Sequence, residues 1–408
     1  MKSQNIDPVT GIVHNVYHYL DPTLYDHGRR VSYILFEMLR DNDQFSESEK
    51  RDIYMLCLLH DIGAVKTKTT VLKPVINSHE EISQSIIGYL IFKNFSPLSM
   101  YADCILYQYQ YNAQYYSVPI SEKHRHIARL LYLANCLDSH LFVQNKSLAQ
   151  FTLLFKNTDF EKFYIEPFLF YNKKHSILMN LRKGYYEGII QSYVIKNIRL
   201  SKSDMYDYFK TFLVSQEMGN DFYAFQAINS ILFGQNFGEI LDMNSNEIEI
   251  IKFSSIMHNL NGISSPPVPT KLFLSYISSE LTQTMEESSL LLDCFYHKKK
   301  AAFTPKRSSE LVALSYFISD YLTEKNNLPK IKHQELFNYI KNAYRTSGLK
   351  ESIPLLLGSH YHSIRQNLFS YYYDLNEESK KMRDEYHFLH SMLMHYQKKY
   401  EGIPKAYL

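Results

Sequence analysis

The chain has 408 residues, of which 45% are hydrophobic, so it is long enough for roughly two or three domains and too apolar for global disorder. Its formal net charge of +2 argues against a strongly basic surface for nucleic acid or an anionic membrane. No stretch approaches the about 18 apolar residues of a membrane span. The polar start MKSQNIDPVTG lacks the apolar core of a signal peptide, and we expect a cytoplasmic protein.

Apolar residues recur at helical spacing along most of the chain, and only 13 glycines and 13 prolines interrupt them. One helix is expected to begin at Asp21-Pro22, and another to follow the Ser/Glu run of residues 46–49. Farther on, helices are predicted over roughly residues 100–111 and 128–138. Because strand-like alternation is missing, the sequence predicts an all-α fold.

A histidine and an aspartate, His60 and Asp61, stand at the end of the second apolar helix and are followed by Gly63. Two ionisable side chains at the end of a buried helix are costly to desolvate unless something compensates them. A metal ion is a common compensation, because imidazole and carboxylate both bind zinc, iron, manganese or magnesium. The alternative is that His60 caps the helix and Asp61 begins the next turn.

The second half of the chain echoes the first at an offset of 198 positions, which takes Leu24 to Phe222 and His60 to His258. Weaker echoes follow in the same order. We therefore predict two tandem helical bundles, a first domain over residues 1–200 and a second over 201–408 that includes the C-terminal helices. Asn259 stands at the position of Asp61 in the second copy, which we expect to be degenerate and without catalysis.

Three segments carry a resemblance to a known family: Asp26-His27-Gly28-Arg29-Arg30-Val31, Leu59-His60-Asp61-Ile62-Gly63 and Gln84-Ser85-Ile86-Ile87-Gly88. Together they resemble the HD superfamily of metal-dependent phosphohydrolases. The greatest similarity is to its HD-GYP branch, which is known for hydrolysing cyclic dinucleotides. The resemblance covers roughly residues 20–170 and, more weakly, 220–350. It implies two tandem HD-domain-like bundles.

The resemblance implies that His27, His60 and Asp61 are metal ligands. It also implies that Arg30 and Lys66 neutralise phosphate. The substituted ligand positions of the family are Gln84, Gln108, Tyr109 and Asn135, with the pair Tyr109-Gln110 as an alternative to Gln108-Tyr109 if the gap is placed differently. Because these side chains bind divalent metals weakly, the resemblance implies that the two-metal centre is lost. One divalent ion (iron, manganese, zinc or magnesium) on the three retained ligands remains as an expectation. Asp138, one helical turn from Asn135, could complete that site.

Two functions remain open from the sequence. The first is a non-hydrolytic signalling, regulatory or assembly module that binds a nucleotide, a cyclic dinucleotide, a protein partner or a second copy of itself. Helix packing requires only the apolar stripes, whereas catalysis requires every ligand. The alternative is a metal-dependent phosphodiesterase or phosphohydrolase that acts on cyclic dinucleotides or other nucleotides through His27, His60 and Asp61. By resemblance, either would be a bacterial signalling protein that binds neither membrane nor nucleic acid.

Overall fold

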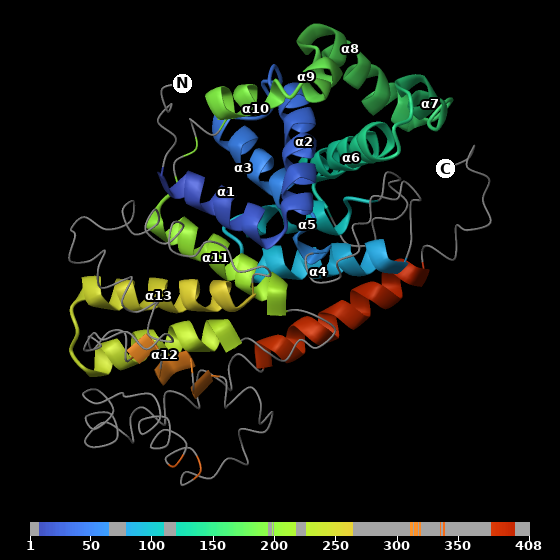
Figure 1. Cartoon of the computed structure of the whole chain (residues 1–408). Helices are drawn as coiled ribbons and strands as arrows, with labels where there is room; N and C mark the ends of the chain where they lie inside the picture. The colour runs from blue at the N-terminus through green and yellow to red at the C-terminus, as the bar shows by residue number, and fades with distance from the viewer. Residues whose placement is uncertain are drawn as a thin grey trace. The chain divides into compact units, whose positions relative to one another are not determined.

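A computed structural model describes residues 8–64, 79–109, 120–194, 198, 200–217, 226–263 and 377–395, and scattered residues between 311 and 338. Every element in these residues is a helix and none is a strand, which confirms the predicted all-α fold (Figure 1). No helix within the described ranges is long and apolar enough to cross a membrane.

The chain forms two compact units, and the second is inserted into the first. The first unit contains Met1–Thr211 and Asp384–Leu408, and the second contains Phe212–Arg383. The chain therefore passes between the units twice, at residues 211–212 and again at residues 383–384. The predicted domain ranges, 1–200 and 201–408, stay a prediction, since compactness alone does not define the two predicted copies.

The first unit begins with helices α1 (Pro8–Leu20), α2 (Pro22–Leu39) and α3 (Glu47–Leu58). The Asp21 side chain caps α2 by accepting hydrogen bonds from the amides of Thr23 and Leu24, each at 3.0 Å. Ser46 and Glu49 form a capping box at the start of α3. Both helix starts predicted from the sequence are thus confirmed, and α2 packs along α3 through a buried apolar face.

After α3 the chain makes a tight turn that carries His60 and Asp61. Helix α3 ends at Leu58, and the short 3₁₀ helix η1 (Ile62–Ala64) follows at once. The amide of Ile62 donates to the Leu59 carbonyl at 2.9 Å, and the amide of Ala64 donates to the Asp61 carbonyl at 2.8 Å. Because the flanking Leu58, Leu59 and Ile62 side chains are fully buried, this turn is fixed to the core of the first unit.

Three further elements complete the surroundings of this turn. They are α4 (His79–Phe95), α5 (Ala102–Leu106) and α6 (Glu122–Asp138), with a 3₁₀ turn, η2 (Ser99–Tyr101), before α5. Helix α4 packs on η1 and α5, and α6 packs on α2 (Figure 1). The predicted helix over residues 128–138 is confirmed, whereas the one predicted over 100–111 is shorter, because the chain leaves the α-helical path at Tyr107.

Shorter helical segments follow in the first unit: η4 (Ser139–Val143), α7 (Leu148–Leu153), η5 (Glu161–Ile165), α8 (Glu166–His175), α9 (Ile177–Arg182), α10 (Tyr186–Ile189) and η6 (Ile190–Val194). Helix α11 (Lys202–Glu217) then runs across residues 211–212 into the second unit. Residues 377–395 form a helix that crosses back at residues 383–384.

In the second unit, α12 (Gln226–Ile240) and α13 (Ser245–Ile263) pack against each other as a helical hairpin. A glycine, Gly234, allows their close approach, because a Cβ at this position would lie 2.8 Å from Cγ2 of Ile251. The Asn259 amide is buried in the hairpin and donates to Ser230 Oγ at 2.8 Å and to the Ser255 carbonyl at 2.7 Å.

Candidate metal centre

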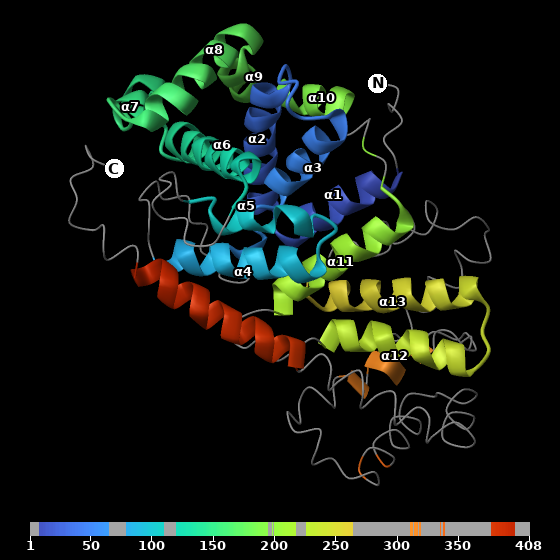
Figure 2. The same ribbon diagram turned by 180° about the vertical axis from the view of Figure 1, so that it is seen from behind.

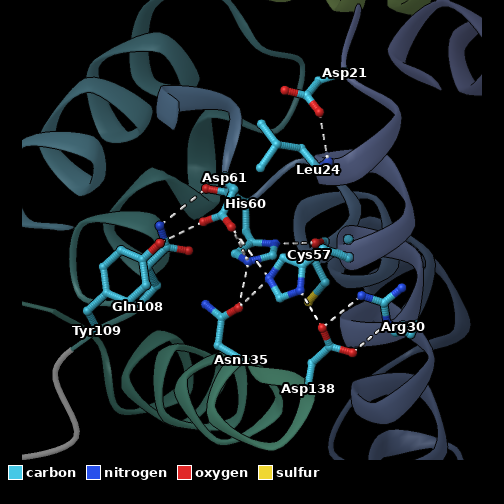
Figure 3. Close-up of polar contacts among 12 residues, drawn as sticks. Asp21, Leu24, Arg30, Cys57, His60, Asp61, Gln108, Tyr109, Asn135 and Asp138 are labelled. Atoms are coloured by element: carbon cyan, nitrogen blue, oxygen red, sulfur yellow. Dashed lines mark hydrogen bonds and ion pairs between the residues drawn. The ribbon is translucent and has the colours of Figure 1, made fainter. Parts of the chain in front are cut away.

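His27, His60 and Asp61 converge in the interior of the first unit. Figure 3 shows His60 and Asp61 side by side, with Asn135 bound to His60. His27 projects from α2, and His60 and Asp61 come from the turn after α3. One potential ligand atom from each of the three lies within 4.8 Å of the other two. Both histidines are buried, whereas the Asp61 side chain is 11% exposed. The geometry that a shared metal ion requires of these three residues is therefore present.

Two glycines allow the backbone approaches that bring these residues together. A Cβ on Gly28, next to His27, would lie 2.2 Å from the Leu58 carbonyl oxygen at the end of α3. A Cβ on Gly63 would lie 2.3 Å from the Gln84 carbonyl oxygen on α4. Since any larger residue would push these backbones apart, the glycines fix the spacing of α2, η1 and α4 around the site.

Each histidine uses its Nδ1 atom to hold the ring in place. His27 Nδ1 donates to Asp138 Oδ2 at 2.7 Å, and His60 Nδ1 donates to the Cys57 carbonyl at 2.6 Å. A carboxylate and a carbonyl can only accept, so both Nδ1 atoms carry hydrogen. In a neutral imidazole the other nitrogen, Nε2, then presents a lone pair. Histidines that bind metals are usually oriented in this way.

Both Nε2 atoms face two oxygen atoms. Asn135 Oδ1 lies 2.8 Å from His27 Nε2 and 2.9 Å from His60 Nε2. Asp61 Oδ2 lies 3.4 Å from the first nitrogen and 3.3 Å from the second. Two lone pairs, a carboxylate oxygen and an amide oxygen repel one another unless a cation lies between them. The donor set of imidazole, carboxylate and amide fits a divalent transition-metal ion.

The pKa shifts of the two histidines indicate how the cluster of His27, His60, Asp61 and Asn135 is stabilised in the absence of a metal ion. Burial acts to lower the pKa of His27, but the hydrogen bond and charge of Asp138, together with the charge of Asp61, raise it above its usual value. For His60, burial dominates and its pKa is lowered, with the charge of His27 acting in the same direction. The two carboxylates thus make a positive charge on His27 easier to hold, and a bound metal ion would bring the same charge.

Asp138 is bound to His27 Nδ1 and is not one of the converging ligands. Figure 3 shows its carboxylate directed toward Arg30. Its carboxylate is fully buried and accepts from Arg30 Nε at 2.6 Å and from Arg30 Nη2 at 3.0 Å. Burial opposes ionisation, but the hydrogen bonds from His27 and Arg30 keep the pKa of Asp138 below its usual value. Asp138 thus orients His27, and the fourth converging atom comes from Asn135.

This role of Asp138 was not predicted from the sequence, although the spacing of the residues contains a signal for it. His27 and Arg30 are three residues apart on α2, and Asn135 and Asp138 are three residues apart on α6. Residues at this spacing share a helix face, so two facing helices bring the four side chains together. Tyr17 of α1 was also missed. Its pKa is raised first by burial and then by the nearby charge of Asp61.

Three of the substituted ligand positions, Gln84, Gln108 and Tyr109, lie beside the turn that carries His60 and Asp61. The Tyr109 hydroxyl donates to Asp61 Oδ1 at 2.7 Å, and Gln108 Nε2 donates to the His60 carbonyl at 3.2 Å. Gln84 is buried on α4 beside this turn. The two Asp61 oxygens therefore have different environments, since Oδ2 faces the imidazoles and Oδ1 accepts from a phenol. Lys66, the other predicted phosphate ligand, lies outside the described residues.

Asp103, Cys104 and His124 form a second group of potential ligands in the described part of the chain. His124 Nδ1 already lies 2.8 and 2.9 Å from the two Asp103 oxygens, and the Cys104 thiol donates to the His124 carbonyl. Burial raises the pKa of this thiol, which opposes the thiolate form that binds metals. We interpret this group as an ion pair beside a core cysteine.

Comparison with known proteins gives a family match for part of the chain. Residues 24–114 match the HD domain, a stretch that contains His27, His60 and Asp61 and ends before Asn135. The 3'3'-cGAMP-specific phosphodiesterase 1 of Vibrio cholerae serotype O1 (strain ATCC 39315 / El Tor Inaba N16961) is 29% identical over 115 residues. That region is 28% of this chain and 26% of the relative, so the similarity spans about a quarter of its length. No solved structure matches.

The family match confirms the HD-domain resemblance over residues 24–114, and the similarity to the phosphodiesterase agrees with it. The HD-domain match ends before the predicted second copy, whose Phe225 and His258 side chain lie outside the described residues. The degeneracy of the metal site likewise stays a prediction. What the structure adds to the matches is the arrangement of His27, His60 and Asp61 with Asn135.

Proposed function

We propose that this chain is a metal-dependent phosphohydrolase that binds one divalent ion through His27, His60 and Asp61. The observation that carries the proposal is the convergence of both Nε2 atoms with Asp61 Oδ2 and Asn135 Oδ1, while both Nδ1 atoms are already committed to other acceptors. Side chains that only fill a core have no reason to direct four acceptor atoms at one point. The HD-domain match over residues 24–114 supports the same function.

When bound, the ion supplies Lewis-acid chemistry, which polarises a phosphoryl oxygen and strengthens water as a nucleophile near neutral pH. The protein's own residues provide the geometry. Asp138 and the Cys57 carbonyl orient the two imidazoles, and Tyr109 fixes the Asp61 carboxylate. Because Arg30 gives two nitrogens to Asp138, we propose that it supports His27 first, and that phosphate binding falls mainly to Lys66.

We further propose a cyclic dinucleotide as the substrate. The support is the similarity to a relative whose name states that it is a 3'3'-cGAMP-specific phosphodiesterase. The HD-domain match over residues 24–114 contains the three proposed ligands. Since the similarity spans about a quarter of that protein, the choice among cyclic dinucleotides and other nucleotides is part of the proposal and requires a substrate screen.

A second candidate function is binding without hydrolysis, and the substituted positions favour it. At the places where the family resemblance implies further ligands, the chain has Gln84, Gln108, Tyr109 and Asn135. Glutamine and asparagine are weak ligands for divalent metals, and the Tyr109 hydroxyl already occupies Asp61 Oδ1. Such a site would hold a nucleotide, or join a protein partner or a second copy of the chain, and release no product.

The predicted second copy remains part of the proposal. The offset of 198 positions takes Glu47, the first residue of α3, to Ser245, the first residue of α13. The hairpin of α12 and α13 also resembles the pair of α2 and α3 in placing a glycine where the helices approach. We propose that the second unit keeps the helix packing of such a copy and has no metal site.

A metal titration with a hydrolysis assay tests the two functions. The purified chain, stripped of metal, would be titrated with Mn²⁺, Fe²⁺ and Zn²⁺ and assayed with 3'3'-cGAMP and with linear dinucleotides. We expect one ion per chain and metal-dependent turnover. Metal binding with nucleotide binding but no turnover would favour the non-hydrolytic function. Absence of metal binding would contradict both the ligand assignment and the enzyme.

The variant Asn135→Asp sharpens the same experiment. The Asn135 amide can present oxygen or, after rotation, nitrogen, and Nδ2 has no partner among the described residues. A carboxylate can only accept and adds a negative charge beside both histidines. We therefore expect about tenfold tighter metal binding. The matched control Asn172→Asp, whose side chain accepts from the Leu178 amide away from the site, should leave metal affinity unchanged.

A further inference from the structure

The inner face of helix α4 touches the backbone of the turn Leu59–Ala64, which carries His60 and Asp61 and is called the metal-site turn below. The Gly63 Cα lies so close to α4 that an added Cβ would be 2.3 Å from the Gln84 carbonyl oxygen and 2.7 Å from the Gly88 amide nitrogen. A Cβ on Gly88 would in turn lie 3.8 Å from the His60 carbonyl oxygen. Because the contact is backbone against backbone, no side chain can adjust to absorb a shift of α4. A displacement of this helix therefore moves His60 and Asp61.

The outer face of the same helix segment is bound by the helix near the C-terminus. Residues 384–395, which belong to the first unit, lie along α4 (Figure 2). Glu385 accepts from Lys93 Nζ at 2.7 and 2.9 Å and from the Tyr89 hydroxyl at 3.1 Å. Tyr386 donates to Ser83 Oγ at 3.2 Å. The contacts at Ser83 and Tyr89 are adjacent in sequence to Gln84 and Gly88, which touch the metal-site turn.

Thr211, at which the chain leaves the first unit, also contacts α4. Thr211, the last residue before the second unit, places Oγ1 3.1 Å from the carbonyl oxygen of Phe95, the last residue of α4. The same hydroxyl lies 2.7 Å from the Asp207 carbonyl oxygen of its own helix, so its single hydrogen is shared between the two acceptors. Glu385 is the second residue after the chain returns. The two points at which the chain leaves and re-enters the first unit are thus both hydrogen-bonded to one helix, and that helix contacts the metal-site turn.

We propose that α4 couples the two junctions of the second unit to the metal centre, with Glu385 and Thr211 as positioning residues. A change in the second unit that shifts either junction moves α4 and thereby alters the spacing of His60 and Asp61. Mere docking of a C-terminal helix would stabilise the first unit as a whole. Coupling instead predicts a local effect on the turn Leu59–Ala64. The link from α4 to the turn is independent of catalysis, whereas its effect on metal binding rests on the proposed function.

Hydrogen exchange on the full-length chain tests the coupling. Glu385→Lys places two like charges together, and we expect exchange of the Ile62 and Ala64 amides to accelerate about fivefold, with metal affinity falling by a similar factor. The double variant Lys93→Glu with Glu385→Lys restores an ion pair and should restore both values. Thr211→Val, which removes the other junction's hydrogen bond, should act in the same direction but more weakly.

The matched control is Asp41→Lys. Asp41 accepts from Lys174 and His175 in a half-exposed ion pair away from α4, so this variant should disturb its own surroundings and leave the turn unchanged. Equal exchange at Leu59–Ala64 in Glu385→Lys and wild type would overturn the coupling, whether or not the chain binds metal. If the turn responds but no variant binds metal, the coupling stands and the proposed function fails. Acceleration in both Glu385→Lys and Asp41→Lys would indicate general destabilisation and would also overturn it.

Discussion

Two helix pairs in this chain bury polar side chains in opposite ways. Between α12 and α13, the Asn259 amide donates to Ser230 and to the Ser255 carbonyl, so the hairpin satisfies it internally. Beside α2 and α3, His27 and His60 direct acceptor atoms toward Asp61 and Asn135. The first arrangement needs nothing more, whereas the second requires a proton or a metal ion.

The polar contact between α12 and α13 therefore serves helix packing, whereas the cluster beside α2 and α3 is suited to binding a cation. A buried amide bound to a hydroxyl and a carbonyl contributes to stability and specifies how the helices pack. A cluster of acceptors destabilises the metal-free protein and is useful only with a positively charged partner. Each of the following changes should therefore affect metal binding or stability according to the region in which it lies.

The largest effect is expected for Asp61→Ala. Removing the carboxylate takes away the anionic ligand that faces both imidazoles, and we expect metal affinity to fall by more than about 100-fold. Calorimetric titration with Mn²⁺ measures this directly. Asn259→Ala, a change in the second unit, provides the control, because it should retain one ion per chain with unchanged affinity. An Asp61→Ala variant that binds metal as tightly as wild type would remove Asp61 from the site.

The next largest effect is expected for Asp138→Asn. Loss of the charge weakens the hydrogen bond that orients His27 and leaves Arg30 without its buried partner, so metal affinity should fall about 10- to 100-fold. Asp103→Asn is a matched control, since it changes another carboxylate that is bound to a histidine, His124, outside the site. If both variants weaken metal binding equally, the effect is one of general stability and Asp138 does not orient a ligand.

A moderate effect on stability is expected for Asn259→Ala. The change removes two buried hydrogen bonds between and within α12 and α13, and should lower the free energy of unfolding of the second unit by about 1–2 kcal/mol. Denaturant unfolding, followed by hydrogen exchange of α12 and α13, measures it. Unchanged protection of these helices would show that the amide contributes nothing to the hairpin, and the contrast with the metal centre would be lost.

The smallest effect concerns an exposed contact that holds α3 to α6. The hydrogen bond from Lys123, followed by those from Ser46, lowers the pKa of Glu49 from 4.5 to about 2. A lowered folded-state pKa supplies stability that is full above pH 4.5 and is lost as the pH falls toward 2. Lys123→Met should lower Tm by about 1–3 °C at neutral pH and flatten its fall between those two pH values. If Tm of the Lys123→Met variant fell between pH 4.5 and pH 2 as steeply as that of the wild type, Lys123 would not be the main cause of the lowered Glu49 pKa.

The all-α fold and the helix starts could be predicted because their signals are local. Asp21 before Pro22 and the Ser46 to Glu49 capping box act within one helical turn, and the structure contains both. The helix predicted over residues 100–111 was too long, because apolar periodicity continues where the backbone of Tyr107 has already left the helix. Periodicity reports which residues face the core, and it does not mark where a short helix ends.

The site could be predicted only in part. His27, His60 and Asp61 form recognisable patterns with their neighbours, and the structure brings them together. The use of Asp138 could not be read from spacing alone, because Asn135 and Asp138 share one helix face and either could have reached a metal. Which of them faces Nε2 and which faces Nδ1 depends on how α6 is rotated against α2. That rotation is set by packing across more than a hundred residues of sequence.

The insertion of one unit into the other also sets the order in which this protein can be built. Helix α4 and the metal-site turn leave the ribosome early, but Glu385 follows only after residues 212–383 have been made. At ordinary rates of synthesis that interval lasts on the order of 10–30 s. During this interval the helix that covers the outer face of α4 has not yet been synthesised. In the nascent chain, Tyr89 and Lys93 therefore lack Glu385, their hydrogen-bond partner nearly three hundred residues later in the sequence.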